Sequence, residues 1–152
     1  MNIQVDPVKY LGLAAPPERI GRLLDIAVSG HAYLPKTDDL AGDWVAHIAA
    51  PAFKLVRAQR GAPIPSFCSI GTGSGLDVLA AIETLGSIRA GFTDLDAEVV
   101  ATAARNVTRN LIDPESVRLE YGAGDLLSPL LKISPRYDII YENLPNVPAA
   151  DG

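Results

Sequence analysis

The residues best suited to bind a ligand lie in one short loop, 70–75, and in two acidic positions beyond it. The loop reads Ile-Gly-Thr-Gly-Ser-Gly and separates an apolar segment from a stretch with helical spacing, which predicts a strand-to-helix turn. Glycines leave backbone amides accessible, and amides at the start of a helix favour a polar or anionic ligand. We therefore expect a ligand at this loop.

The loop departs from two common nucleotide-binding patterns. A dinucleotide fingerprint needs a third glycine at the position that Leu76 occupies after Gly71 and Gly73. A Walker loop needs a lysine and a hydroxyl residue where Gly75 is followed by Leu76 and Asp77. Both departures argue against dinucleotide cofactors and against nucleotide hydrolysis.

Two carboxylates follow the loop, each at the end of a predicted strand. Asp94 stands about twenty residues beyond it, where a carboxylate can accept both hydroxyls of an adenosine ribose. Asp125 follows the next strand and could accept the exocyclic amine of an adenine. Either residue alone could simply cap a turn. Because the carboxyl ends of parallel strands meet at one edge, the three features together predict a nucleoside site.

An amide side chain follows the fourth predicted strand, Tyr137–Tyr141. The next segment, 143–148, reads Asn-Leu-Pro-Asn-Val-Pro. Asn143 could be an ordinary turn residue after a strand. Its carbonyl could also accept an N–H from a substrate and so point the nitrogen lone pair toward a methyl donor.

The order of these features over residues 66–148 resembles class I S-adenosylmethionine-dependent methyltransferases, most closely the release-factor glutamine N5-methyltransferase type with its Asn-Pro-Pro-Tyr motif. The resemblance implies a Rossmann-like α/β sheet, S-adenosyl-L-methionine as cofactor, and methyl transfer to a nitrogen of a small-molecule, peptide or protein substrate. It assigns the catalytic positions to Asn143, Leu144 and Pro145, and no metal ligands are predicted. It places the cofactor against Ile70, Gly71, Thr72, Gly73, Gly75, Asp94, Leu95, Asp125, Leu126 and Asn143.

The sequence differs from that family at three positions. Leu144 replaces the first proline of the motif and Asn146 replaces its aromatic residue, so the acceptor need not be a glutamine amide. Ser69 occupies a position before the loop that is commonly acidic in the family, which affects how the methionine ammonium would be held. These differences leave an alternative open, namely a noncatalytic cofactor-binding domain or a fragment of a larger or split methyltransferase.

Alternating strands and helices must position these residues. Helices are expected at 75–85 and from Asp96 onward, and short apolar segments predict the strands of a parallel sheet at 67–70, 88–93, 117–121 and 137–141. The methyltransferases that the sequence resembles have further strands, so we expect a sheet truncated after the fourth. Its open edge could pair with a second copy of the chain or with a missing C-terminal half.

Residues 1–62 are predicted to form an N-terminal helical segment, separate from the cofactor-binding core at 63–152. Apolar residues recur with helical spacing over 18–30. A second helix is expected from about residue 37 to about residue 60, with a kink or a new start at Pro51.

Aromatic residues of this segment are interpreted as structural. Tyr33 and Trp44 are expected to pack in the core, because aromatics on amphipathic segments usually belong to the packing face. His31 and His47 have no spaced ligand partner, so we interpret them as solvated or core histidines.

Composition excludes several classes of protein. With 48% hydrophobic and 20% charged residues the chain is typical of globular domains, and no apolar run approaches the roughly 20 residues that span a bilayer. The net charge of −5 without a basic cluster argues against a nucleic-acid partner. The single cysteine, Cys68, cannot form an intrachain disulfide, and the start lacks a signal-peptide pattern, so we expect a cytoplasmic protein.

Overall fold

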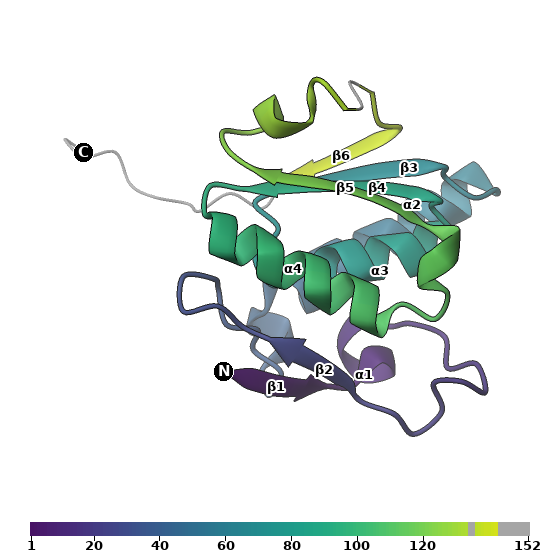
Figure 1. Ribbon diagram of the computed structural model, residues 1–152. Helices are drawn as coiled ribbons and strands as arrows, with labels where there is room; N and C mark the ends of the chain where they lie inside the picture. The colour runs from purple at the N-terminus through teal and green to yellow at the C-terminus, as the bar shows by residue number, and fades with distance from the viewer. Residues whose placement is uncertain (134–135, 143–152) are drawn as a thin grey trace, which may run out of the picture.

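The computed structural model describes residues 1–133 and 136–142, and its centre is a four-stranded parallel sheet (Figure 1). The chain therefore has an α/β fold that is compatible with a Rossmann-like architecture. The predicted strands are confirmed with shifts of one or two residues at their ends. In spatial order they are β5 (Arg118–Ala123), β4 (Arg89–Asp94), β3 (Ser66–Ile70) and β6 (Ile139–Glu142).

The two central strands are the most buried part of the sheet. Every residue of β3 is buried, and burial raises the pKa of the Cys68 thiol to about 12, as expected for an inert core cysteine. From β3 the chain moves outward to β4 and β5 and then returns to the other side of β3 as β6. This reversal of direction creates a crevice at the carboxyl ends of the strands, where open α/β sheets bind ligands. In the described part of the chain β6 pairs only with β3.

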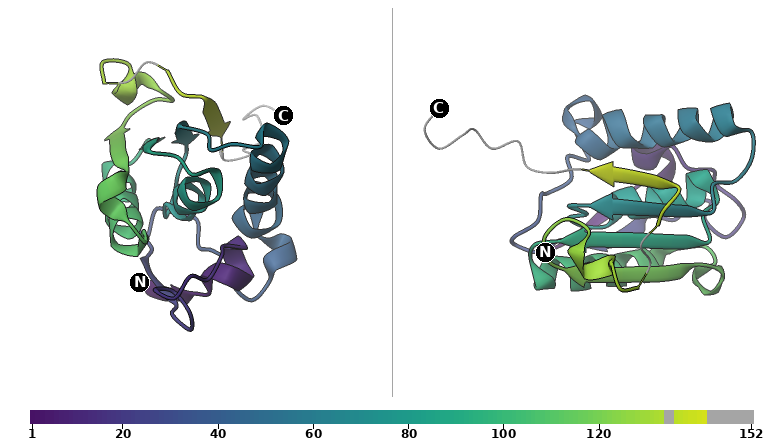
Figure 2. Two further views of the ribbon diagram at one scale, coloured as in Figure 1. Left: turned by 90° about the vertical axis from the view of Figure 1, so that its right-hand side faces the viewer. Right: turned by 90° about the horizontal axis from the view of Figure 1, so that it is seen from above.

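Three helices cover one face of the sheet (Figures 1 and 2). The middle helix, α3 (Leu76–Leu85), contacts α2 (Ala50–Arg60) on the β6 side and α4 (Ala97–Asn110) on the β5 side. Because it is enclosed by helices and sheet, α3 is apolar on nearly all sides. The expected start of a helix at Asp96 is confirmed, since the Asp96 carboxylate caps α4 by accepting from the amides of Glu98 and Val99.

The expected helix over 18–30 is wrong. Residues Leu24–Ala27 form strand β2, which pairs antiparallel with β1 (Asn2–Val5) on the far side of α4 from the main sheet (Figure 1). Leu24 and Ile26 alternate as in a strand and both are buried, whereas the helical spacing came from Ile20, Leu23, Leu24, Ala27 and Val28. Two side chains of α4 decide the outcome, because the Asn106 amide bonds both N and O of Ala27, and Asn110 bonds the backbone of Asp25. These asparagines act as a neighbouring strand would.

The remaining N-terminal segment is only partly helical, so the predicted helical character of 1–62 is correct in part. A short helix, α1 (Pro7–Leu11), follows β1. A turn, η1 (Leu40–Gly42), and a wide helical turn, η2 (Val45–Ala49), lead directly into α2. Pro51 lies in the first turn of α2 and has no N–H to donate, so the predicted restart at this proline is confirmed. Among the described residues no helix combines the length and hydrophobicity needed to cross a membrane.

Candidate functional site

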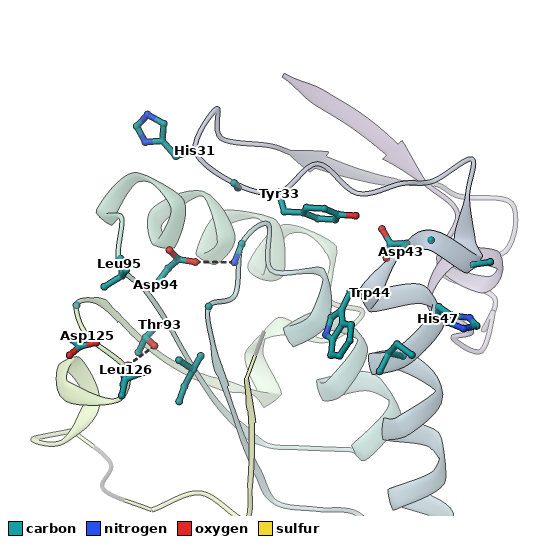
Figure 3. A pocket seen from close by; sticks show the side chains of 18 residues that line it. His31, Tyr33, Asp43, Trp44, His47, Thr93, Asp94, Leu95, Asp125 and Leu126 are labelled. Carbon is teal, nitrogen blue, oxygen red and sulfur yellow. Dashed lines mark hydrogen bonds between the residues drawn. The ribbon is translucent and has the colours of Figure 1, made fainter. Parts of the chain in front are cut away.

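A cavity of about 710 Å³ opens over the carboxyl ends of β3, β4 and β5 (Figure 3). Two walls enclose this cavity. We call the strand ends the first wall and the segment that leads into η2 the second wall. Seven of the predicted cofactor-binding residues line the cavity together, namely Ile70, Gly71, Gly73, Asp94, Leu95, Asp125 and Leu126.

The glycine loop adopts the backbone conformation for which glycine is required, with φ of 76° at Gly71 and 59° at Gly73. Its amides already have acceptors within the protein. The Gly71 and Thr72 amides donate to the carbonyl of Thr93 at 2.9 and 3.1 Å, and the Gly73 amide donates to an Asp94 carboxylate oxygen at 3.2 Å. The loop is therefore a shaped wall of the cavity and a poor cradle for a phosphate.

Two residues predicted to contact the cofactor lie outside the cavity lining. A Cβ on Gly75 would lie 3.1 Å from the Ala103 carbonyl oxygen and from a methyl of Val107, so this glycine permits α3 and α4 to pack closely. Thr72 is buried and its hydroxyl donates to Asp77 at 3.0 Å. Both residues shape the loop from behind.

The two predicted carboxylates differ in how they are held. Asp94 is half-buried, faces the cavity and is oriented by the Gly73 amide (Figure 3). Asp125 is exposed, and within the described residues its carboxylate has no hydrogen-bond partner. Both oxygens of Asp125 are thus available to a ligand, whereas Asp94 can accept from a ligand and from the loop together.

Two exposed leucines flank these carboxylates. Leu95 is 78% exposed and Leu126 is 49% exposed, and both line the cavity. Leu126 has a φ of 47°, which is strained for a residue with a side chain, and its carbonyl accepts from the Thr93 hydroxyl at 2.7 Å. The hydrogen bond from Thr93 holds the turn that carries Asp125 in this conformation. Apolar surfaces beside a hydrogen-bonding carboxylate suit the face and edge of a purine base.

The second wall consists of residues that sequence analysis did not assign to a site. Tyr33 and Trp44 are 51% and 44% exposed, so the expectation that they pack in the core is wrong. His47 is exposed, as one of the expected interpretations holds, yet it lines the cavity beside Ile48. The expected continuous helix would have directed these side chains toward the core. Instead the chain forms two different helical turns, η1 and η2, in this segment. The sequence signal that could have indicated this wall is the cluster of aromatic residues and histidines in a segment that contains glycine and proline.

Asp43 anchors this second wall. It is buried, and its carboxylate accepts from the Tyr10 hydroxyl at 2.6 Å, the Lys36 amide at 2.8 Å and the Ala46 amide at 2.9 Å. Burial, reinforced by this contact, raises the pKa of the Tyr10 hydroxyl, which stays a donor. One carboxylate thereby joins α1, the approach to η1, and η2.

His31 connects the rim of the cavity to the start of α4. Its Nδ1 contacts the Asp96 carboxylate, and this hydrogen bond raises the pKa of His31 and lowers the pKa of Asp96. With Glu98 these residues bring three possible metal ligands within 4.8 Å. The positive end of the α4 dipole disfavours a cation at this place, and Asp96 is already engaged as the helix cap.

Carboxylates outnumber the basic groups around the cavity, where His31 and His47 are the basic side chains among the described lining residues. Among the described residues that line it there is no lysine or arginine, while Asp43, Asp94 and Asp125 contribute carboxylates. A ligand that carries phosphates would meet repulsion from these carboxylates without a lysine or arginine to offset it. A ligand with a positive centre would be favoured.

Below the loop lies a buried carboxylate, Asp77. It accepts from the Ser69 hydroxyl at 2.5 Å, the Thr72 hydroxyl at 3.0 Å and the Val78 amide at 2.8 Å. Burial raises the pKa of Asp77 to about 6 from an ordinary value of 3.8, although the hydrogen bonds oppose that rise. Ser69, which we expected to influence the methionine ammonium, is committed to this carboxylate.

The pH dependence of folding should report the state of Asp77. Because its folded-state pKa is raised, its stabilisation is complete below the unfolded pKa and is lost as pH rises through the folded pKa of about 6. Asp77→Asn stays neutral, so it should gain about 2 kcal/mol relative to wild type between about pH 4 and about pH 7. Urea unfolding of both proteins at the two pH values measures this. A stability difference that is constant with pH would contradict the raised pKa.

Comparisons with known proteins add no relative. No protein-family model matches this chain, and a comparison with curated proteins finds no match. The predicted catalytic residues Asn143, Leu144 and Pro145 lie outside the residues that the structure describes. The cavity is therefore the feature that indicates a function for this protein.

Proposed function

We propose that this protein is an S-adenosylmethionine-dependent methyltransferase that transfers a methyl group to a nitrogen of a small or peptidic acceptor. One observation carries the proposal. A cavity at the carboxyl ends of parallel strands combines a glycine loop, two accessible carboxylates and no lysine or arginine among its described lining residues.

The charge of the cavity favours this cofactor over nucleotides that use the same fold. S-Adenosylmethionine carries a sulfonium, an ammonium and a carboxylate, so its net charge is positive. Dinucleotides and nucleoside triphosphates carry phosphates, which would compete with Asp94 for the Gly73 amide and would face Asp125. The missing dinucleotide and Walker patterns agree with this selection.

The residues of the first wall suggest how the nucleoside would be bound. Asp94 would accept the ribose hydroxyls, and Asp125 would accept the exocyclic amine of the adenine. Leu95 and Leu126 offer apolar surface to the faces of the base. Gly71 and Gly73 would border the methionine part, where a side chain would narrow the cavity.

The acceptor would approach from the side of β6. Asn143 follows β6 directly in the sequence, and we propose that its carbonyl orients the acceptor nitrogen toward the methyl group. The sulfonium is an activated donor, so alignment of the lone pair and exclusion of water supply the acceleration without a strong base.

Calorimetry with three ligands tests the cofactor assignment. S-Adenosylhomocysteine should bind, and ATP and NAD should bind at least about a hundredfold more weakly, because they bring phosphates to a cavity whose described lining residues include three aspartates and no lysine or arginine. Equal or tighter binding of ATP would contradict the assignment. Transfer of a labelled methyl group to added amines and peptides then separates an enzyme from a domain that only binds the cofactor.

A further inference from the structure

The second wall of the cavity carries two large aromatic side chains that the protein itself leaves half uncovered. Tyr33 and Trp44 both line the cavity on the side away from Asp125 (Figure 3). We propose that this wall binds the methyl acceptor and that the acceptor presents an uncharged, flat aromatic or heteroaromatic group. This inference rests on the proposed function, which places the cofactor at the strand ends.

Trp44 is held in a defined orientation without being covered. Its indole N–H donates to the Tyr141 hydroxyl at 2.5 Å. Tyr141 is fixed in turn by Phe67, with which it stacks at 6.3 Å, and by the edge of Phe53 at 5.5 Å. Among the described residues no aromatic ring packs against Trp44 itself. The chain therefore preorganises an apolar surface and leaves it open to a ligand.

Tyr33 extends the same wall. The Lys36 ammonium lies 6.0 Å from the centroid of its ring, and half of the side chain remains exposed. Aromatic side chains exposed in a cavity bind flat partners by stacking or by edge-to-face contact, which adds to the burial of apolar area. His47 and the Tyr33 hydroxyl provide polar contacts at the rim of this wall.

The charges of the cavity and of the cofactor favour an uncharged group on the acceptor. Among the described residues of this wall Asp43 is the only one with a carboxylate, and both of its oxygens already accept from Tyr10, Lys36 and Ala46. An anionic acceptor would find no lysine or arginine among the described lining residues and would face Asp94 and Asp125. A cationic acceptor would approach a sulfonium, which repels it. A neutral ring is repelled neither by the carboxylates nor by the sulfonium.

The experiment uses the protein's own reporter, because Trp44 is the single tryptophan of the chain. With S-adenosylmethionine at saturation, so that the sulfonium is present, four probes are titrated while the tryptophan fluorescence is followed. They are benzamide, the anion benzoate, the cation benzamidinium and the non-planar cyclohexanecarboxamide. Benzamide should produce a saturable change, with a dissociation constant at least about tenfold lower than those of the other three.

Variants of Tyr33 test the wall while Trp44 remains as reporter. Tyr33→Leu should weaken benzamide binding about five- to tenfold, and Tyr33→Phe should stay within about threefold of wild type, because the ring is retained. Tyr121→Leu is the matched control. Tyr121 is a half-exposed tyrosine outside this cavity, so its loss should leave benzamide binding unchanged.

Three results would overturn the inference. They are a change with benzamide that never saturates, binding of benzamidinium or cyclohexanecarboxamide as tight as that of benzamide, and competition between benzamide and S-adenosylhomocysteine. Competition would mean that the aromatic wall holds the adenine of the cofactor. Failure of S-adenosylhomocysteine to bind by calorimetry overturns the proposed function instead, so the two failures are distinguishable.

Discussion

Asp94→Ala should weaken the binding of S-adenosylhomocysteine more than about a hundredfold. The carboxylate would accept both ribose hydroxyls, and the loss of two charge-assisted hydrogen bonds to a buried ligand costs on the order of 3 kcal/mol. The substitution also removes the acceptor of the Gly73 amide, so the loop loses a contact that shapes the cavity. Calorimetry of the purified variant measures the affinity directly.

Two further variants separate these contributions to affinity. Asp94→Asn keeps one oxygen for the Gly73 amide, so it should lose less affinity, about tenfold. Asp113→Ala removes the same charge from an exposed position outside this cavity and should bind like wild type. Unchanged affinity in Asp94→Ala would remove Asp94 from the site and with it the proposed position of the ribose.

The sheet and its helices could be predicted because their signals are local. Strand β3 reads as an apolar run that ends in glycines, and Asp96 stands directly before the periodic apolar residues of α4. Parallel strands place their carboxyl ends at one edge, so the order of the chain was enough to bring Asp94 and Asp125 to the same cavity.

The N-terminal segment could not be predicted in this way, because its structure depends on distant partners. β2 is a strand because β1 pairs with it and because Asn106 and Asn110, on α4, bond its backbone. The stretch carries both patterns, since Leu24 and Ile26 alternate as in a strand while Leu23, Leu24 and Ala27 have helical spacing. Nothing near residue 24 shows that two asparagine side chains more than 80 positions away supply the missing partners.

The aromatic wall was missed for the same reason. Whether Trp44 faces a core or a cavity depends on the path of residues 31–49, and that path is fixed by Asp43 and by the Tyr141 hydroxyl. The sequence prediction treated this segment as part of one regular helix. The structure replaces it with two different helical turns, which changes the face on which Trp44 and Ile48 lie.

Asp43→Ala should lower the free energy of unfolding by about 4 kcal/mol. The substitution leaves the Tyr10 hydroxyl and the amides of Lys36 and Ala46 without their acceptor, and each such buried group costs about 1–3 kcal/mol. Domains of this size are stable by only about 5–15 kcal/mol, so the variant should unfold at much lower urea. The fluorescence of Trp44 reports the transition. A loss below about 1 kcal/mol would contradict the anchoring role.

Two further variants distinguish the hydrogen-bonding role of Asp43 from the effect of its charge. Asp38→Ala removes an exposed carboxylate of the same segment and should change stability by less than about 0.5 kcal/mol. Asp43→Asn keeps one acceptor and folds more readily, so it allows ligand binding to be measured even if Asp43→Ala does not fold. In Asp43→Asn the affinity for benzamide should fall more than the affinity for S-adenosylhomocysteine, because Asp43 positions the aromatic wall and has no bond to the strand ends. Equal losses for both ligands would mean that the two walls depend on Asp43 alike, and that the aromatic wall is no separate subsite.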